Sequence, residues 1–170
     1  EGVRQRVEDG YTVVKVDIDD SAPEGFRKDL HNRALSREEV EYMSAVSHAA
    51  YEALPNDVEL CLDMHWCYQP ADALRVAHRL ADIDIMWLED PTPPENIDAL
   101  KYVTDHTSVP IACGENHWMS HGLRAMIENR AADIITPDIP RFGGVQEGKK
   151  VAELCELHSL AFAPHNICTP

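Results

Sequence analysis

Six short apolar runs, each followed by a more polar stretch, constrain the fold of this 170-residue chain more than any other feature. The runs are rich in Val and Ile and have few polar interruptions, which is typical of parallel strands covered on both faces. They occupy residues 11–18, 58–64, 83–90, 109–115, 132–138 and 160–165. The alternation of these runs with helical stretches predicts an α/β fold built on a parallel sheet.

Five amphipathic stretches separate these runs and carry apolar residues three and four positions apart, as one face of a helix requires. They are residues 36–54, 71–82, 96–107, 120–131 and 145–158. The first begins with Ser36 and Glu39, the pattern of a capping box in which two side chains satisfy backbone amides of the first turn. We therefore expect five helices between or beside the strands.

Ionisable residues close the later runs at nearly even intervals of 23 to 27 residues: Asp63, Glu89, Glu115, Asp138 and His165. A unit of about 25 residues holds one strand, one helix and two short loops. Near-equal units favour a (β/α) barrel over an open doubly wound sheet.

One interval is longer, the 48 residues from Lys15 to Asp63. We expect residues 21–35 to form an insertion in this interval. A long loop at the carboxyl end of a strand often faces the substrate.

Composition limits the partners. The 15 basic and 30 acidic residues give a net charge of −15, which repels phosphate backbones and anionic lipid, so neither nucleic acid nor a membrane surface is expected as a partner. No apolar run approaches the roughly 20 residues that span a bilayer, and the charged residues 1–10 do not resemble a signal peptide. We expect a cytoplasmic protein. Its five cysteines lack paired spacing and predict free, mostly buried thiols.

Three of the strand-end residues are carboxylates on successive strands: Asp63, Glu89 and Glu115. In a (β/α) barrel the carboxyl ends of the strands meet at one face, so the three groups should converge and repel one another unless a cation neutralises them. Hard oxygen donors without a cysteine partner favour Mg²⁺. A helix cap or a solvated loop explains any one of them alone, but three in register favour a metal site.

Three of the nine histidines also lie at strand ends: His65, His117 and His165. Asp138 ends the strand before the one that carries His165, so the two side chains should meet. Such a contact orients the imidazole and raises its basicity, as a general base requires. The other six histidines fall within helices or loops, where a surface or structural role is expected.

The motifs "LDMH", "WLEDPTPPEN", "IACGEN", "IITPDIPRFGGVQEGKKVAELCE" and "LAFAPH" together resemble the enolase superfamily. Within it, the mandelate racemase subgroup and its acid-sugar dehydratases, of the galactonate and gluconate dehydratase kind, are the most similar. The resemblance spans residues 11–170 and implies a TIM-like (β/α)7β barrel. It assigns residues 1–170 to a partial barrel catalytic domain holding strands two to seven, without the first and eighth strands or the capping domain.

The resemblance implies a Mg²⁺-dependent lyase of carbohydrate catabolism, a dehydratase of a sugar acid (an aldonate), which forms a 2-keto-3-deoxy acid. Its metal ligands would be Asp63, Glu89 and Glu115. A divalent cation suits this chemistry because removal of a proton α to a carboxylate creates a doubly charged enediolate. Such superfamily sites are a known example of a Lys or His base working beside Mg²⁺.

The same resemblance implies the roles of the other groups. His165, paired with Asp138, would be the base that removes the α-proton, and His65 would protonate the departing β-hydroxyl. Lys15 and His117 are candidate substrate-binding residues, although Lys15 in a structural salt bridge is an equal alternative. The partner would be a small-molecule sugar acid, and the full-length enzyme would form a homo-oligomer.

One departure separates the chain from the racemases of the subgroup. These end the second strand with Lys-x-Lys, whose second lysine is a base opposite the histidine, whereas this chain has Asp17 there. The change favours one-base elimination of water over racemisation, which needs two opposed bases. A racemase or epimerase, and a non-catalytic fragment that keeps the scaffold, remain the alternatives.

Overall fold

The computed structural model describes residues 2–19 and 34–167. Within them, one sheet of six parallel strands has the order β1-β2-β3-β4-β5-β6. The strands are β1 (Val13–Asp17), β2 (Glu59–Asp63), β3 (Trp87–Glu89), β4 (Ile111–Cys113), β5 (Ile134–Ile135) and β6 (Ala161–Phe162). The spatial order of the strands is their chain order. That is the order of a barrel wall, because a doubly wound sheet reverses direction at its switch point.

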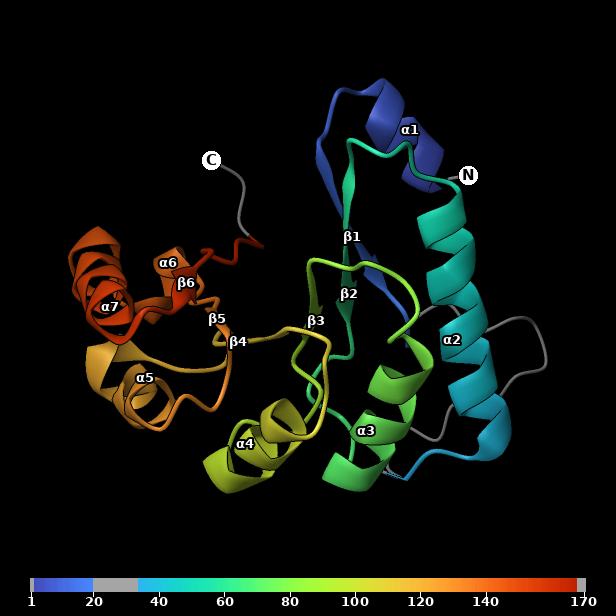
Figure 1. The fold of residues 1–170 in the computed structure, drawn as a ribbon. Coiled ribbons are helices and arrows are strands. Elements are labelled where there is room, and N and C mark those ends of the chain that lie inside the picture. The colour runs from blue at the N-terminus through green and yellow to red at the C-terminus, as the bar shows by residue number, and fades with distance from the viewer. Residues whose placement is uncertain (1, 20–33, 168–170) are drawn as a thin grey trace.

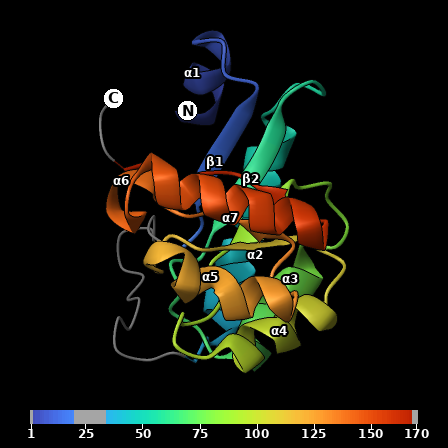
Figure 2. The ribbon, with the colours of Figure 1, turned by 90° about the vertical axis from the view of Figure 1, so that its left-hand side faces the viewer.

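The helices are α1 (Gly2–Glu8), α2 (Arg37–Glu52), α3 (Pro70–Arg79), α4 (Ile97–Asp105), α5 (Met119–Glu128), α6 (Ile139–Phe142) and α7 (Val145–His158). Figure 1 shows the strands following an arc, with α2, α3, α4, α5 and α7 along its outer side. In the side view of Figure 2, α7, α5 and α4 lie beside one another. This arrangement confirms the predicted α/β fold class.

All five expected helices are present. The predicted capping box opens α2: the Ser36 hydroxyl accepts from the Glu39 amide at 3.1 Å, and the Glu39 carboxylate accepts from the Ser36 amide at 2.6 Å. Helix α7 has the bounds that its apolar pattern predicts. The short helices α1 and α6 were not expected. The predicted insertion, residues 21–35, lies mostly outside the described residues.

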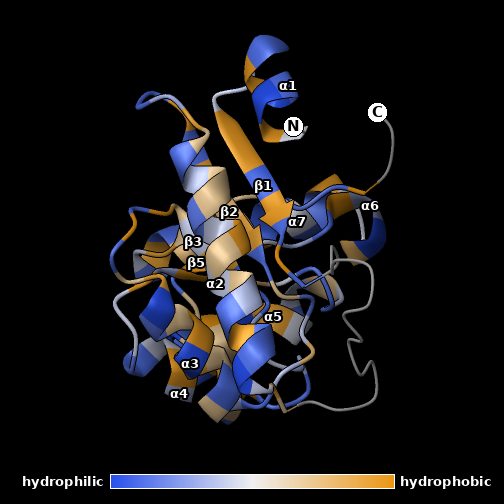
Figure 3. Ribbon diagram, turned by 90° about the vertical axis from the view of Figure 1, so that its right-hand side faces the viewer, coloured by the Kyte–Doolittle hydropathy of each residue, from blue (hydrophilic) through white to orange (hydrophobic). Residues whose placement is uncertain are grey.

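The hydrophobic core lies between the outer face of the sheet and the helices. Leu60, Leu62 and Leu88 point from β2 and β3 into this layer and are fully buried, as are Leu123 and Ile127 of α5. Figure 3 shows hydrophilic and hydrophobic residues alternating along the outer helices, as expected for helices with one face in a core.

Four of the five cysteines lie in the described residues, and all four are free thiols, as predicted. Cys61, Cys113 and Cys155 are buried, and Cys67 is partly buried. Cys168 lies outside the described residues. No helix in the described part of the chain is both long and apolar enough to cross a membrane.

Candidate active site

The strand register places polar side chains together on the inner face of the sheet. Asp17 pairs with Asp63 in β1 and β2, and Asp63 pairs with Glu89 in β3. Paired residues of parallel strands point to the same face, and residues two apart on one strand do so too. Lys15 of β1 therefore shares this face with Asp17, Asp63 and Glu89, opposite the leucines of the core.

Lys15 forms two ion pairs across these strands. Its Nζ lies 2.8 Å from Asp63 Oδ2 and 3.1 Å from Glu89 Oε2. Burial opposes its charge, but the carboxylates of Glu89 and Asp63 outweigh burial and raise the pKa of Lys15. Burial raises the pKa of Glu89 as well, although Lys15 and the indole N–H of Trp87 oppose this. The structural salt bridge, one of the two roles expected for Lys15, is present in this structure.

Glu115 reaches the site from the end of β4 through Gly114. Gly114 has a φ of +156°, and a Cβ added to it would lie 2.8 Å from the backbone nitrogen of Thr136. A side chain at residue 114 would therefore collide with the chain that follows β5. Glu115 lies beyond β4 and is 7% exposed, and its Oε2 is 2.6 Å from His165 Nε2.

His165 lies between two buried carboxylates. Its Nδ1 is 3.0 Å from Asp138 Oδ2, which is the contact expected from the order of the strands, and its Nε2 contacts Glu115. Asp138 and His165 also form a parallel bridge beyond β5 and β6. The hydrogen bond to Glu115 raises the pKa of His165, burial opposes it, and the bond to Asp138 adds to it. The two contacts together make the imidazole of His165 more basic than a free one.

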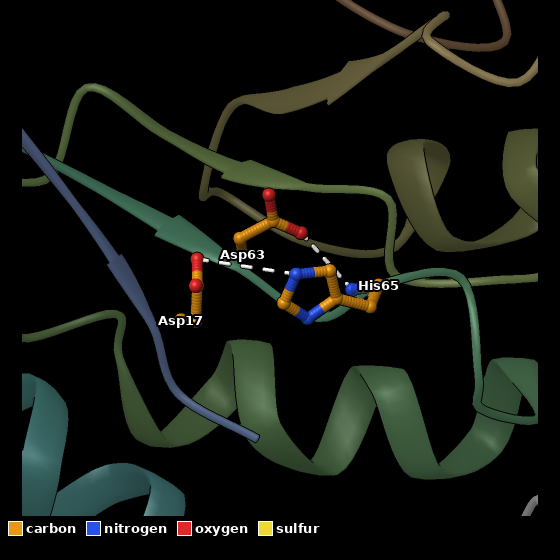
Figure 4. Close-up of side chains that lie close together, drawn as sticks. All are labelled: Asp17, Asp63 and His65. Atoms are coloured by element: carbon orange, nitrogen blue, oxygen red, sulfur yellow. Dashed lines mark hydrogen bonds and ion pairs between the residues drawn. The ribbon is translucent and has the colours of Figure 1, made fainter. Parts of the chain in front are cut away.

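His65 follows β2 and lies against two carboxylates, Asp17 at the end of β1 and Asp19 two residues beyond it. Its Nδ1 is 2.7 Å from Asp19 Oδ1, and its Nε2 is 4.0 Å from Asp17 Oδ1. Figure 4 shows His65 beside Asp17 and Asp63, and the Asp63 carboxylate accepts the backbone N–H of His65 at 3.0 Å. The hydrogen bond to Asp19 is the largest cause that raises the pKa of His65 to about 9. His65 therefore holds its proton more tightly than a free imidazole does.

His117 lines a cavity of about 580 Å³ beyond β3 and β4. Trp66 and Trp118 form other walls of this cavity, and burial lowers the pKa of His117. The cavity does not include Lys15, Glu89 or His165, which line a separate, smaller one of about 200 Å³. Both cavities lie at the carboxyl ends of the strands. Trp66, which follows His65 directly in the sequence, brings the larger cavity next to His65.

Two groups in the described residues bring ligand atoms within 4.8 Å of one another: Asp17, Asp63 and His65, and Glu89, Glu115 and His165. The three carboxylates predicted to share a metal are thus divided between two groups, which Lys15 links by contacting both Asp63 and Glu89. The positive charge of Lys15 offsets part of the negative charge of Asp63 and Glu89. A set of carboxylate oxygens of this kind fits a divalent cation, and neither of the two described groups includes a cysteine.

Asp19 and Tyr68 complete the site and were missed from the sequence. Tyr68 donates its hydroxyl to Asp19 Oδ2 at 3.2 Å, and both side chains are almost fully buried. The only signal available was a second aspartate two residues beyond Asp17. Nothing in a strand pattern shows which way that residue turns after the strand has ended.

The fold and this site define a (β/α)-barrel protein with carboxylates and histidines gathered at the carboxyl ends of its strands, where barrel enzymes have their active sites. The enolase C-terminal domain-like family matches residues 1–170, and the chain belongs to this family. Enzymes of the superfamily typically use a divalent metal, and the groups described above could bind one.

Relatives and solved structures agree with this assignment. A D-xylonate dehydratase of Haloferax volcanii is 42% identical over all 170 residues, which cover 41% of that protein. A D-mannonate dehydratase of a Sphingomonas species is 32% identical over 69% of this chain and 29% of its own length. The crystal structure of a mandelate racemase/muconate lactonizing enzyme-like protein from Rubrobacter xylanophilus matches 99% of this chain and 43% of its own, with a TM-score of 0.93 and 39% identity. The chain spans less than half the length of these relatives.

Proposed function

We propose that this chain belongs to the catalytic barrel of a Mg²⁺-dependent sugar-acid dehydratase. The observation that carries the proposal is a pair of histidines, His165 and His65, that lie on one sheet end and each contact a buried aspartate. Elimination of water needs one base and one acid, and these two residues supply both. The names of the relatives, D-xylonate and D-mannonate dehydratase, support the same reaction.

In the proposed reaction His165 accepts the proton α to the substrate carboxylate at Nε2, and the C–H electron pair enters the enediolate. That pair then forms the C=C bond while the β C–O bond breaks. His65 gives its Nε2 proton to the departing hydroxyl, which leaves as water, and the enol becomes the 2-keto-3-deoxy acid. Asp138 holds the His165 ring and stabilises the imidazolium that forms.

Nε2 of His165 contacts Glu115 in this structure, so proton abstraction requires that Glu115 release it and that Nε2 carry no proton. We propose that Asp63, Glu89 and Glu115 hold Mg²⁺. When bound, the ion would supply the positive charge that stabilises the enediolate.

Lys15 would remain close to the substrate carboxylate while it neutralises Asp63 and Glu89. His117 would contact the sugar chain from the neighbouring cavity.

A substrate screen tests the proposal. The full-length protein with Mg²⁺ is offered D-xylonate, D-gluconate, D-galactonate and D-mannonate, and 2-keto acid is measured. We expect release from at least one aldonate, with D-xylonate the first candidate because of the 42% identical relative. Deuterium entering the α-carbon without loss of water would instead identify a racemase or epimerase. No product, no exchange and no Mg²⁺ binding would identify a non-catalytic scaffold.

We further propose that the full-length protein is a cytoplasmic homo-oligomer that acts in carbohydrate catabolism. Size-exclusion chromatography with light scattering tests the oligomeric state, and a monomer would contradict it.

A further inference from the structure

We propose that Asp19 is a positioning residue for His65, and that Tyr68 holds Asp19 in place. The inference rests on the proposed dehydratase function and extends it, because it gives the second histidine a buried aspartate partner of its own. Each of the two histidines would then be held by a different aspartate: His165 by Asp138 and His65 by Asp19.

Distances and burial support this chain of contacts. The Asp19 side chain is fully buried, and its two oxygens have separate partners: Oδ1 lies 2.7 Å from His65 Nδ1, and Oδ2 accepts the Tyr68 hydroxyl at 3.2 Å. Tyr68 is itself only 2% exposed. A buried carboxylate with both oxygens engaged has little freedom to turn, so it fixes the direction of the imidazole that it contacts.

The backbone of the turn after β2 also serves to aim this ring. His65 and Trp66 have φ angles of +47° and +48°, a left-handed conformation that is costly for residues other than glycine. The turn is held by hydrogen bonds from the His65 amide to Asp63 Oδ1 at 3.0 Å and from the Trp66 amide to the Asp90 carbonyl at 2.6 Å. The Trp66 and His65 rings are in an edge-to-face contact with centroids 5.8 Å apart.

The chemistry follows from which nitrogen is engaged. When Nδ1–H donates to Asp19, Nε2 is the atom left to face the site, where the nearest described acidic oxygen is Asp17 Oδ1 at 4.0 Å. Asp17 is half exposed and makes the weaker contact, so Asp19 is the residue that sets the ring. A carboxylate on one nitrogen stabilises the imidazolium and leaves the proton on the other nitrogen for transfer.

The substitution Asp19→Asn tests the proposal because only one of the two proton transfers depends on His65. In the variant either the amide NH₂ faces Nδ1, which disfavours the imidazolium, or the amide turns and Tyr68 loses its acceptor. We expect the rate of 2-keto acid release to fall about 100-fold to 1000-fold, the lower part of the roughly 10²–10⁴-fold contribution of a general acid, because His65 itself is kept. Exchange of the α-proton with D₂O needs His165 alone and should stay within about threefold of wild type.

A substrate analogue sharpens the test. In a 3-deoxy-3-fluoro aldonate, fluoride leaves with the C–F electron pair and needs no proton, so Asp19→Asn should release it within about threefold of the wild-type rate. Tyr68→Phe, which keeps the ring and removes the hydroxyl, should show a smaller loss in the same direction. The matched control is Asp82→Asn, since Asp82 contacts His48 at 3.2 Å on the exposed surface. It should change neither reaction.

Equal losses of dehydration and exchange in Asp19→Asn and Tyr68→Phe would overturn the proposal, because they would show general damage to the fold. Dehydration within threefold of wild type would overturn it too. A ¹⁵N NMR spectrum of His65 is independent of activity. We expect a protonated Nδ1 bound to a carboxylate in wild type, and in Asp19→Asn either loss of that proton or a ¹⁵N shift that reports a weaker, neutral acceptor. If wild type releases no 2-keto acid while this NMR signature is present, the proposed function fails and the Asp19 contact stands. Without the signature the contact itself is refuted.

Discussion

Replacement of Lys15 by methionine should destabilise the protein strongly, because Lys15 neutralises two buried carboxylates. Its Nζ contacts Asp63 and Glu89, whose side chains are 4% and 2% exposed. Methionine keeps most of the length and volume of the lysine stem, so the main change is the loss of the positive charge. The two carboxylates would then face each other on neighbouring strands without a counter-charge.

The structure sets the size of the effect. At an effective dielectric constant of about 20, one ion pair at about 3 Å is worth on the order of 5 kcal/mol before desolvation is subtracted. The lysine side chain is 32% exposed, so solvent screens part of this attraction, and its own desolvation offsets more. Loss of one partner from a buried pair costs roughly 3–5 kcal/mol. We take the lower end, about 3 kcal/mol in the free energy of unfolding.

Urea unfolding of wild type and Lys15→Met in the presence of EDTA measures this difference. The matched control is Lys101→Met, since Lys101 pairs with Asp105 at 3.0 Å on the exposed side of α4 and should contribute less than about 0.5 kcal/mol. Millimolar Mg²⁺ should stabilise Lys15→Met more than wild type, because the ion restores a positive charge between the carboxylates. A change below about 0.5 kcal/mol for Lys15→Met would refute the reasoning.

Three further predictions concern the elements that support the site. Gly114→Ala should lower the free energy of unfolding by about 2–3 kcal/mol, because the added Cβ would lie 2.8 Å from backbone. The control Gly122→Ala, whose Cβ would have no contact closer than 3.8 Å, should be neutral or stabilising, and thermal unfolding distinguishes the two variants. Ser36→Ala should cost about 1 kcal/mol by removing the cap of α2, and an unchanged urea midpoint would contradict this. The pKa of His65 is raised to about 9, so its contribution to stability should be complete below about pH 6.5 and disappear as the pH rises through 9. Asp19→Asn should flatten that part of the stability profile, and an identical profile would show that the pair does not titrate as described.

The order of the strands and the gathering of their ends could be predicted because both follow from repetition. Near-continuous apolar strands that alternate with amphipathic helices of period 3.6 are compatible with few topologies. Near-equal intervals between the strand ends favour a barrel wall among them. Once that wall is assumed, residues at strand ends must share one face. The contact between Asp138 and His165 was predictable for this reason, as was the capping box of α2, which depends on four consecutive residues.

Features set by turns were not predictable. Asp19 lies two residues beyond β1, where alternation no longer determines direction, and the His65–Trp66 turn has a left-handed backbone that usually signals glycine. The pairing of Lys15 with Asp63 and Glu89 depends on the length of a flexible side chain across three strands. The observed strands are also shorter than the apolar runs, because burial continues into loops where the ladder hydrogen bonds have ended.

Direct titration of Mg²⁺ into the full-length protein tests the central claim, that the strand-end carboxylates hold the metal on which the chemistry depends. Calorimetry on wild type should show one site per chain. Asp63→Asn, Glu89→Gln and Glu115→Gln should each weaken it by at least about 100-fold, while Glu128→Gln, on the exposed surface of α5, should bind as wild type does. Equal affinity in wild type and the three site variants would contradict the account.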